Sequence, residues 1–373
     1  MRASDRQIVK AAIQRLNANN AARKETGLYP LELVLLYVTM RCNAKCAHCF
    51  CRDNLNTGLP EYTIEQLEKI AESMPRVRMI ILTGGEPMLR ADLADVFRVF
   101  ASRGKVETVM INTNGLQPQK TIALTEELKS EFPDVGLEWQ FSLDGLAATH
   151  DRIRGVPGNF DKVIESLSAV YSLKQRFPCL GAHALTVINA ENHTELVTLN
   201  DYLREAIHPD VVHGFELMRD VDQTAWNIPP KIKEDNAGPS LLQLPPVESF
   251  DQIARDLKLL NKRAAVRANA FHIHNLAQLE MVRTGKPQYP CVTAGESVAV
   301  LYSDGAVAHC EFTKPFANLA EFDFDFNALW RSGAAEKRRA QIKRCHCTHG
   351  CFHGKSVEYS WKGIAKMAAA ALL

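Results

Sequence analysis

The chain has 373 residues, a formal net charge of +1, 46% hydrophobic residues and 23% charged residues. These proportions are typical of a folded globular protein, and they exclude a disordered chain. The near-neutral charge also excludes a general nucleic-acid or membrane-surface binder, because such proteins carry an excess of basic residues. At this length we expect one large domain and a smaller second one.

The N-terminal segment, residues 1–24, has the pattern of a charged amphipathic helix. It lacks the apolar stretch and the small-residue cleavage site of a signal peptide. The longest apolar run, residues 31–40, is too short to cross a bilayer. We therefore expect a cytoplasmic protein whose thiols stay reduced, with no membrane or nucleic-acid partner.

Short apolar runs alternate with helical stretches from residue 31 to residue 219. The expected strands are residues 31–39, 79–83, 107–112, 137–143, 180–188 and 211–218. The expected helices are residues 63–74, 92–103, 120–132, 160–177 and 193–206. This alternation predicts an α/β fold with parallel strands, in which ligands bind at the carboxyl ends of the strands.

The composition changes after residue 219. Residues 220–246 hold five prolines and show no periodicity, so we expect a long connection or lid there. A helical pattern follows over residues 250–283 and completes a connecting region that we place at residues 220–284. Two alternating runs, residues 297–302 and 306–310, flank an Asp-Gly turn and predict a β-hairpin. A small cysteine-bearing domain is therefore expected over residues 285–373.

Seven of the ten cysteines gather in two groups, residues 42–51 and 345–351, which favours metal binding over a disulfide framework in a chain of this length. Cys42, Cys46 and Cys49 follow the first expected strand with the spacing C-x3-C-x2-C. A zinc site would need a fourth ligand, from His48 or Cys51. A [4Fe–4S] cluster held by three cysteines would keep one iron open. The spacing alone permits either metal centre.

The strand ends that follow resemble those of the radical S-adenosylmethionine (radical SAM) superfamily. The second expected strand runs into residues 83–87 (TGGEP), the third into 112–115 (NTNG) and the fourth into 141–145 (FSLDG), before residues 149–154 (THDRIR). Together with the three-cysteine loop, these motifs imply a partial (β/α)6 TIM-like barrel. They also imply that the loop holds a [4Fe–4S] cluster and that S-adenosylmethionine (SAM) is the second cofactor.

The same resemblance assigns residues to SAM binding. They are Gly84, Gly85, Glu86, Asn114, Ser142, Asp144 and Arg154. The glycines and the glutamate would contact the SAM amino group, the serine and the arginine its carboxylate, and the other two the ribose or the cavity wall. Ordinary turn and helix-cap chemistry is the alternative for the Asn-Gly and Asp-Gly pairs. The resemblance places the adenine near residues 186–189 and 216–218. His48 stands where the superfamily usually has an aromatic residue that packs on the adenine; an imidazole can also stack, and the sequence leaves the role of His48 open.

The carboxyl-terminal cysteines resemble the SPASM/twitch pattern of the same superfamily. Cys291 and Cys310, with Gly305 between them, match its opening, whereas Cys345, Cys347 and Cys351 match its closing part incompletely. The resemblance implies one auxiliary [4Fe–4S] cluster, with Cys291 and Cys310 as ligands and one spare thiol among the other three. Zinc is the alternative, because three histidines lie nearby in sequence. The two remaining cysteines fit no ligand pattern, and Cys179 is expected to be buried before its strand.

The resemblance implies a radical SAM enzyme that removes a hydrogen atom from its substrate. Only about thirty residues precede the first expected strand, too few for the peptide-recognition domain that many peptide-modifying relatives carry. This favours a small sugar-like or alcohol substrate, or a peptide delivered by a partner, with flavodoxin or ferredoxin as electron donor. The alternatives are a radical SAM enzyme that crosslinks or epimerises a ribosomal peptide, and a zinc- or cluster-bearing regulatory protein. Catalytic residues are expected in residues 220–246 and around Glu311, although the sequence does not assign them.

Overall fold

The computed structural model describes residues 1–220, 222–234, 240–343 and 345–372. Six parallel strands alternate with helices over residues 33–217, as the sequence predicts. The strands are β1 (Leu33–Thr39), β2 (Val77–Gly84), β3 (Val106–Thr113), β4 (Gly136–Ser142), β5 (Leu180–Ile188) and β6 (Val212–Leu217). The helices between them are α2 (Ile64–Ser73), α3 (Leu93–Ala101), α4 (Pro118–Glu131), α5 (Ala147–Arg154), α6 (Asn159–Leu173) and α7 (Leu196–Ala206).

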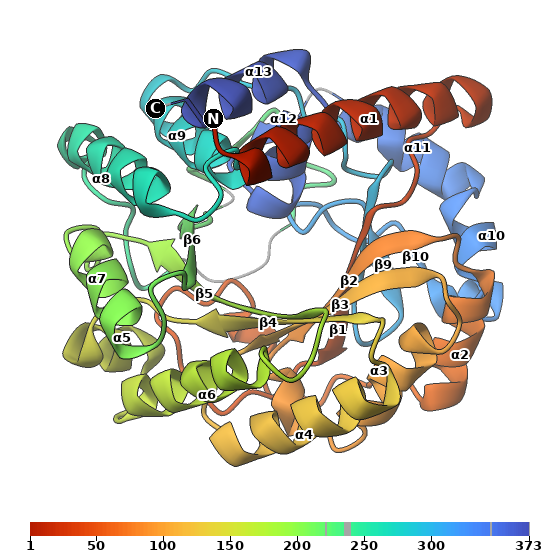
Figure 1. Ribbon diagram of the computed structural model, residues 1–373. Helices are drawn as coiled ribbons and strands as arrows, with labels where there is room; N and C mark the ends of the chain where they lie inside the picture. The colour runs from red at the N-terminus through yellow and green to blue at the C-terminus, as the bar shows by residue number, and fades with distance from the viewer. Residues whose placement is uncertain (221, 235–239, 344, 373) are drawn as a thin grey trace.

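The six strands lie in sequence order and curve into an open barrel with their helices on the outside (Figure 1). Side chains alternate along each strand, so β1 buries Val34 and Leu36 under the helices and turns Tyr37 to the barrel interior. The expected capping box is present, because Thr63 accepts from the Gln66 N–H and begins α2. The α/β fold class is thus confirmed, and the carboxyl ends of all six strands meet at one edge.

The expected hairpin forms but does not make a sheet of its own. Strands β8 (Val298–Leu301) and β9 (Ala306–Ala308) are antiparallel, and β10 (Ala317–Asn318) pairs with β9. β8 also pairs in parallel with β1, which extends the barrel sheet to nine strands. The cysteine-rich segment therefore begins against the first barrel strand, and this places Cys310 next to the barrel interior.

The connection after β6 is tied to the carboxyl-terminal cysteines. Strand β7 (Ala225–Trp226) pairs with β11 (His346–Cys347), and the Trp226 ring stacks on His346 at 5.2 Å. The helical pattern predicted over residues 250–283 is two helices, α8 (Phe250–Arg263) and α9 (Ala270–Thr284). The first ends because Ala264 is extended, and the second begins at Asn269, whose side chain accepts from the Phe271 N–H.

The N-terminal helix packs against the end of the chain. Helix α1 (Ala3–Thr26) lies along α13 (Trp361–Ala370), above α9 and α12 (Lys355–Glu358), and their apolar side chains form one small core (Figure 1). Short helices α10 (Phe326–Trp330) and α11 (Gly333–Ile342) follow β10. Among the described residues, none of these helices combines the length and apolarity needed to cross a membrane.

Candidate active site

The three-cysteine loop follows β1 and turns back on itself. The Cys49 N–H donates to the Cys46 carbonyl at 3.2 Å, and the Ala44 N–H donates to the Cys42 sulfur at 3.4 Å. Burial raises the pKa of Cys42 to about 11, and the thiols of Cys46 and Cys49 act in the same direction. The three partly exposed thiols thus belong to one short loop that turns back on itself.

The donor set of this loop fits an iron–sulfur cluster better than zinc. The candidate fourth zinc ligands are engaged elsewhere, since His48 Nε2 lies 3.6 Å from Asp144 and Cys51 Sγ lies 3.9 Å from the Tyr37 hydroxyl. Across the described ranges no three His, Cys, Asp or Glu side chains are arranged around a single ion. Three soft thiolates without a fourth ligand suit a cluster that keeps one iron open.

Two glycines let the end of β2 lie against the chain that enters the cysteine loop. A Cβ on Gly85 would meet the Arg41 carbonyl at 2.2 Å, and one on Gly84, whose φ is +120°, would meet the Thr39 carbonyl at 2.2 Å. The close approach allows the Glu86 N–H to donate to the Arg41 carbonyl at 2.8 Å. The glycines therefore seat the cysteine loop on the sheet.

Glu86 joins the ends of β2 and β3. Its carboxylate is buried and accepts from the Asn114 N–H at 2.7 Å, the Thr113 hydroxyl at 2.9 Å and the Met88 N–H at 3.1 Å. Burial raises the pKa of Glu86, and these hydrogen bonds oppose the rise without cancelling it. Asn114 in turn donates to Asn43 in the cysteine loop at 2.8 Å. Both residues that the motif assigned to SAM are thus engaged in holding the loop.

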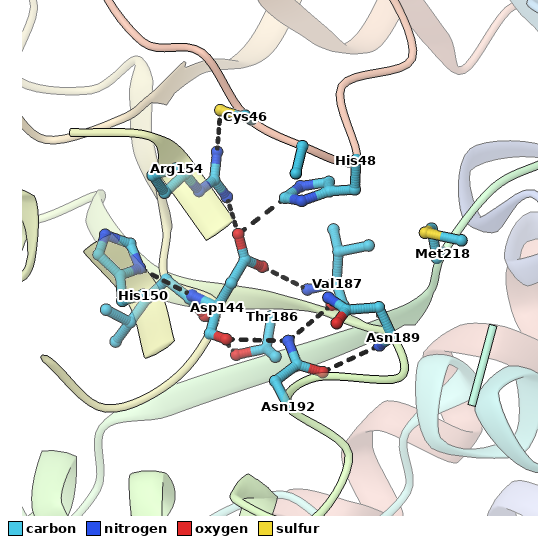
Figure 2. A network of polar contacts seen from close by, with 12 residues as sticks. Cys46, His48, Asp144, His150, Arg154, Thr186, Val187, Asn189, Asn192 and Met218 are labelled. Carbon is cyan, nitrogen blue, oxygen red and sulfur yellow. Dashed lines mark hydrogen bonds and ion pairs between the residues drawn. The ribbon is translucent and has the colours of Figure 1, made fainter. Parts of the chain in front are cut away.

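Asp144 is the centre of a second network, after the end of β4 (Figure 2). The side chain is fully buried; Arg154 Nη2 lies 2.6 Å from it, and the Val187 N–H of β5 donates to it at 2.8 Å. Arg154 also reaches back to the Cys46 sulfur at 3.6 Å. Burial would raise the pKa of Asp144, but Arg154 and His48 hold it below its usual value. Asp144 therefore orients Arg154 and His48.

His150 completes this network from the side of α5. Its Nδ1 accepts from the Asp144 N–H at 3.0 Å, and its Nε2 lies 3.1 Å from Asn159 Oδ1. Burial, together with the charge of Arg154, lowers the pKa of His150 to about 4. The ring is therefore neutral in the folded protein at neutral pH. Ser142, the remaining assigned residue, is half-buried at the end of β4.

A neutral buried histidine makes stability depend on pH. The unfolded chain binds a proton to His150 below pH ~6.5, whereas the folded chain does so only near pH 4, so its contribution is complete above pH 6.5 and is lost on acidification. Between pH 7 and 5 this histidine should account for about 2 kcal/mol of lost unfolding free energy. Urea unfolding of His150→Gln should show a pH-dependent loss smaller by that amount, whereas a variant of the exposed His208 should keep the full loss.

The carboxyl-terminal cysteines have different surroundings. Cys291 acts electrostatically on Cys310, Cys345 and Cys347, which places these four thiols in one region, and Cys345 Sγ also donates to the Asn227 carbonyl at 3.2 Å. Burial raises the pKa of Cys351 to about 12, and the charges that act on it next are Glu311 and Arg219. The reason is local, because β11 holds Cys347 whereas Cys351 lies in a wide helical turn, Gly350–Gly354, that packs against Glu216 of β6.

The nearby histidines that make zinc the alternative have other partners. His346 stacks on Trp226, and His353 lies 2.8 Å from His274, nitrogen to nitrogen. His349 contacts Glu311. The four neighbouring thiols thus form an all-sulfur set, as a [4Fe–4S] cluster requires.

A cluster of polar side chains lies between the two cysteine groups, and the sequence motifs do not assign its residues. Glu311, directly after Cys310, is buried and accepts from Arg219 Nη1 at 2.8 Å and from the Tyr37 hydroxyl. Arg219 follows β6 and covers the ring of Phe50, which belongs to the cysteine loop, at 5.1 Å. The position of Arg219 directly after a strand end is the one feature of the sequence that could have indicated a place in the site.

One expectation about the cysteines is wrong. Cys179 is exposed, with φ +59°, at the amino end of β5. It precedes the first buried residue of the strand, Leu180, so the apolar pattern begins one residue after it. Its carbonyl accepts from the Leu137 N–H at 3.0 Å, which shows that its backbone rather than its thiol contributes to the sheet.

Known proteins match this chain in sequence and in fold. The Radical SAM superfamily model matches residues 36–203. Pre-heme d1 synthase of Dinoroseobacter shibae is 32% identical over 176 residues, which are 46% of this chain and 41% of that protein. SuiB of Streptococcus suis, solved bound to S-adenosylmethionine, has a TM-score of 0.58 at 14% identity, and the match covers 85% of this chain and 69% of the SuiB chain. Native anSMEcpe with bound AdoMet has a TM-score of 0.57 at 16% identity, and the match covers 91% of this chain and 99% of that chain.

The family model matches the first part of the chain only. The matched family region begins within β1 and ends in α7, so it includes the cysteine loop and both networks but neither β6 nor the carboxyl-terminal cysteines. The match covers less than half the length of pre-heme d1 synthase. The solved structures extend the likeness of fold beyond the family region, because they cover most of the chain.

Proposed function

The chain carries a radical SAM superfamily domain in residues 36–203, and from this premise we propose that it removes a hydrogen atom from an organic substrate by radical chemistry. The observation that carries the proposal is the three-thiol loop held over the strand ends by Glu86, Asp144 and Arg154. A reduced cluster held there by Cys42, Cys46 and Cys49 would supply the electron for the reductive cleavage of SAM, which would provide the radical that removes the hydrogen atom.

The chain's own residues prepare this site before any cofactor binds. Cys42, Cys46 and Cys49 would hold the cluster, and the Arg154 contact to Cys46 would stabilise the thiolate form of that ligand. Ser142 lies at the same strand ends, and with Arg154 it is the candidate for the SAM carboxylate. The buried networks fix these groups in advance, which reduces the reorganisation needed during the reaction.

We assign the auxiliary cluster to Cys291, Cys310, Cys345 and Cys347. Their mutual proximity supports this set, and the different surroundings of Cys351 leave it as the spare thiol. The cluster would lie beside the barrel interior, because Cys310 and Cys347 pack on the apolar side chains of β1 and β8. From there it would exchange an electron with the substrate or relay one from a flavodoxin or ferredoxin.

The assignment predicts different effects for two closely spaced cysteines. Cys347→Ala should lose the auxiliary cluster, about four irons per chain, whereas Cys351→Ala should keep it. Iron and sulfide analysis after anaerobic reconstitution, with Mössbauer spectra of both variants, provides the measurement. Full auxiliary iron in Cys347→Ala, or its loss in Cys351→Ala, would contradict the assignment.

The substrate is proposed to be a small sugar-like or alcohol molecule or a peptide, and one observation keeps the peptide in view. SuiB was solved with its precursor peptide SuiA, and its fold covers 85% of this chain with a TM-score of 0.57. The test is formation of 5′-deoxyadenosine by reconstituted enzyme with dithionite and SAM, with candidate substrates added one at a time. A protein that holds both clusters and forms none would refute the proposed function.

A further inference from the structure

The guanidinium of Arg219 lies between the two groups of cysteines. On one side it covers Phe50 of the cysteine loop at 5.1 Å, and on the other it contacts Glu311, the neighbour of Cys310. Burial raises the pKa of both Cys51 and Cys351 to about 12, and the charge of Arg219 opposes the rise in each. The guanidinium thus lies between the cysteine loop and the segment that follows Cys310.

One nitrogen anchors this guanidinium. Arg219 Nη1 donates to Glu311 at 2.8 Å and lies 2.7 Å from His349 Nε2. Glu311 is itself fixed, because its other oxygen accepts from the Tyr37 hydroxyl. These contacts fix the position of the guanidinium.

The opposite edge of the guanidinium is open. Within the described part of the chain, Nε and Nη2 of Arg219 form no hydrogen bond, and neither belongs to the buried polar atoms that lack a partner. The side chain is 33% exposed, whereas its partner Glu311 is 4% exposed. The Nε–Nη2 edge presents two parallel N–H groups, which match the two oxygens of a carboxylate.

We propose that Arg219 binds a carboxylate group of the substrate through this edge. The inference rests on the proposed function, because it assumes that the reaction occurs between the two clusters. A singly charged carboxylate suits the site better than a phosphate dianion, since Glu311 already balances part of the arginine charge. Glu216, which acts on neighbouring Cys351, adds further negative charge. The substrate class is therefore an organic acid or an acidic peptide, which share this group.

The test measures binding to the reconstituted enzyme with SAM by calorimetry. The probes are succinate, a hexapeptide with one glutamate, the matching amides of both, and inorganic phosphate. The wild type should bind at least one carboxylate probe more tightly than its amide, and Arg219→Gln should reduce that preference about tenfold or more. Whether succinate or the hexapeptide is preferred identifies the source of the carboxylate. Arg255→Gln, on the exposed face of α8, is the control and should change nothing.

One further variant and one assay make the outcome decisive. Arg219→Gln leaves Glu311 buried without its cation, so Arg219→Lys, which keeps the charge but not the planar edge, is the second variant and should restore only part of the preference. The proposal would be overturned if the wild type bound carboxylate and amide probes equally. It would also be overturned if Arg219→Lys kept the full preference for carboxylate over amide, or if the wild type bound phosphate more tightly than the carboxylate probes. Formation of 5′-deoxyadenosine without substrate is assayed in parallel, and its absence from the wild type would count against the proposed function instead.

Discussion

Cys46→Ala is expected to lose the SAM-binding cluster and with it all formation of 5′-deoxyadenosine. Cys46 is one of three thiols in a loop that offers no fourth ligand, so the remaining two do not replace it. The iron content should fall by about four per chain, the auxiliary iron should remain, and SAM cleavage with dithionite should drop to background. Iron analysis and chromatographic detection of 5′-deoxyadenosine on the same preparation measure both effects.

Two other cysteines serve as controls for this variant. Cys51→Ala removes the next thiol in the loop, which lies 3.9 Å from the Tyr37 hydroxyl and is not one of the three proposed ligands, and it should keep full iron. Cys179→Ala removes the exposed thiol at the opposite end of the barrel. If Cys46→Ala retained the iron and the activity of the wild type, the three-thiol site would be wrong.

The barrel could be predicted from the sequence because its signals are local. An uninterrupted apolar run such as that of β1, whose seven residues are all buried, has few alternatives to a covered parallel strand. The capping box of Thr63 and Gln66 defines the start of α2 from four consecutive residues. The three-thiol loop is equally local, since its ligands lie within eight residues.

The partners within the site could not be predicted, because they come from distant parts of the chain. Arg219 meets Glu311 across 92 residues and His349 across 130, and no spacing rule relates such positions. Cys351 shows a second limit. Its spacing from Cys347 fits a ligand pattern, but the sequence does not show that it lies in the turn at Gly350–Gly354, which packs against Glu216. Local spacing indicates which residue types are available, and only tertiary packing decides which of them meet.

Asp144→Asn is expected to destabilise the protein by about 3 kcal/mol or more in the absence of cofactors. The change leaves Arg154 without the carboxylate that balances it, at a position where the two side chains are 9% and 0% exposed. The surface pair of Arg152 and Glu191 gives the matched control, because its side chains are 57% and 34% exposed at a similar distance of 2.8 Å. Glu191→Gln should cost about 1 kcal/mol or less. Urea unfolding at pH 7 measures both.

The pH dependence of the same variants separates charge from packing. The pKa of Asp144 is lower in the folded chain than in the unfolded one, so its stabilisation is complete above pH ~4 and is lost as the pH falls through the folded value. The difference in unfolding free energy between the wild type and Asp144→Asn should therefore become smaller below pH 4 and stay constant between pH 5 and 7. A constant difference across the whole range would mean that Asp144 contributes through packing alone, and Arg154 would then need another group to hold it at the cysteine loop.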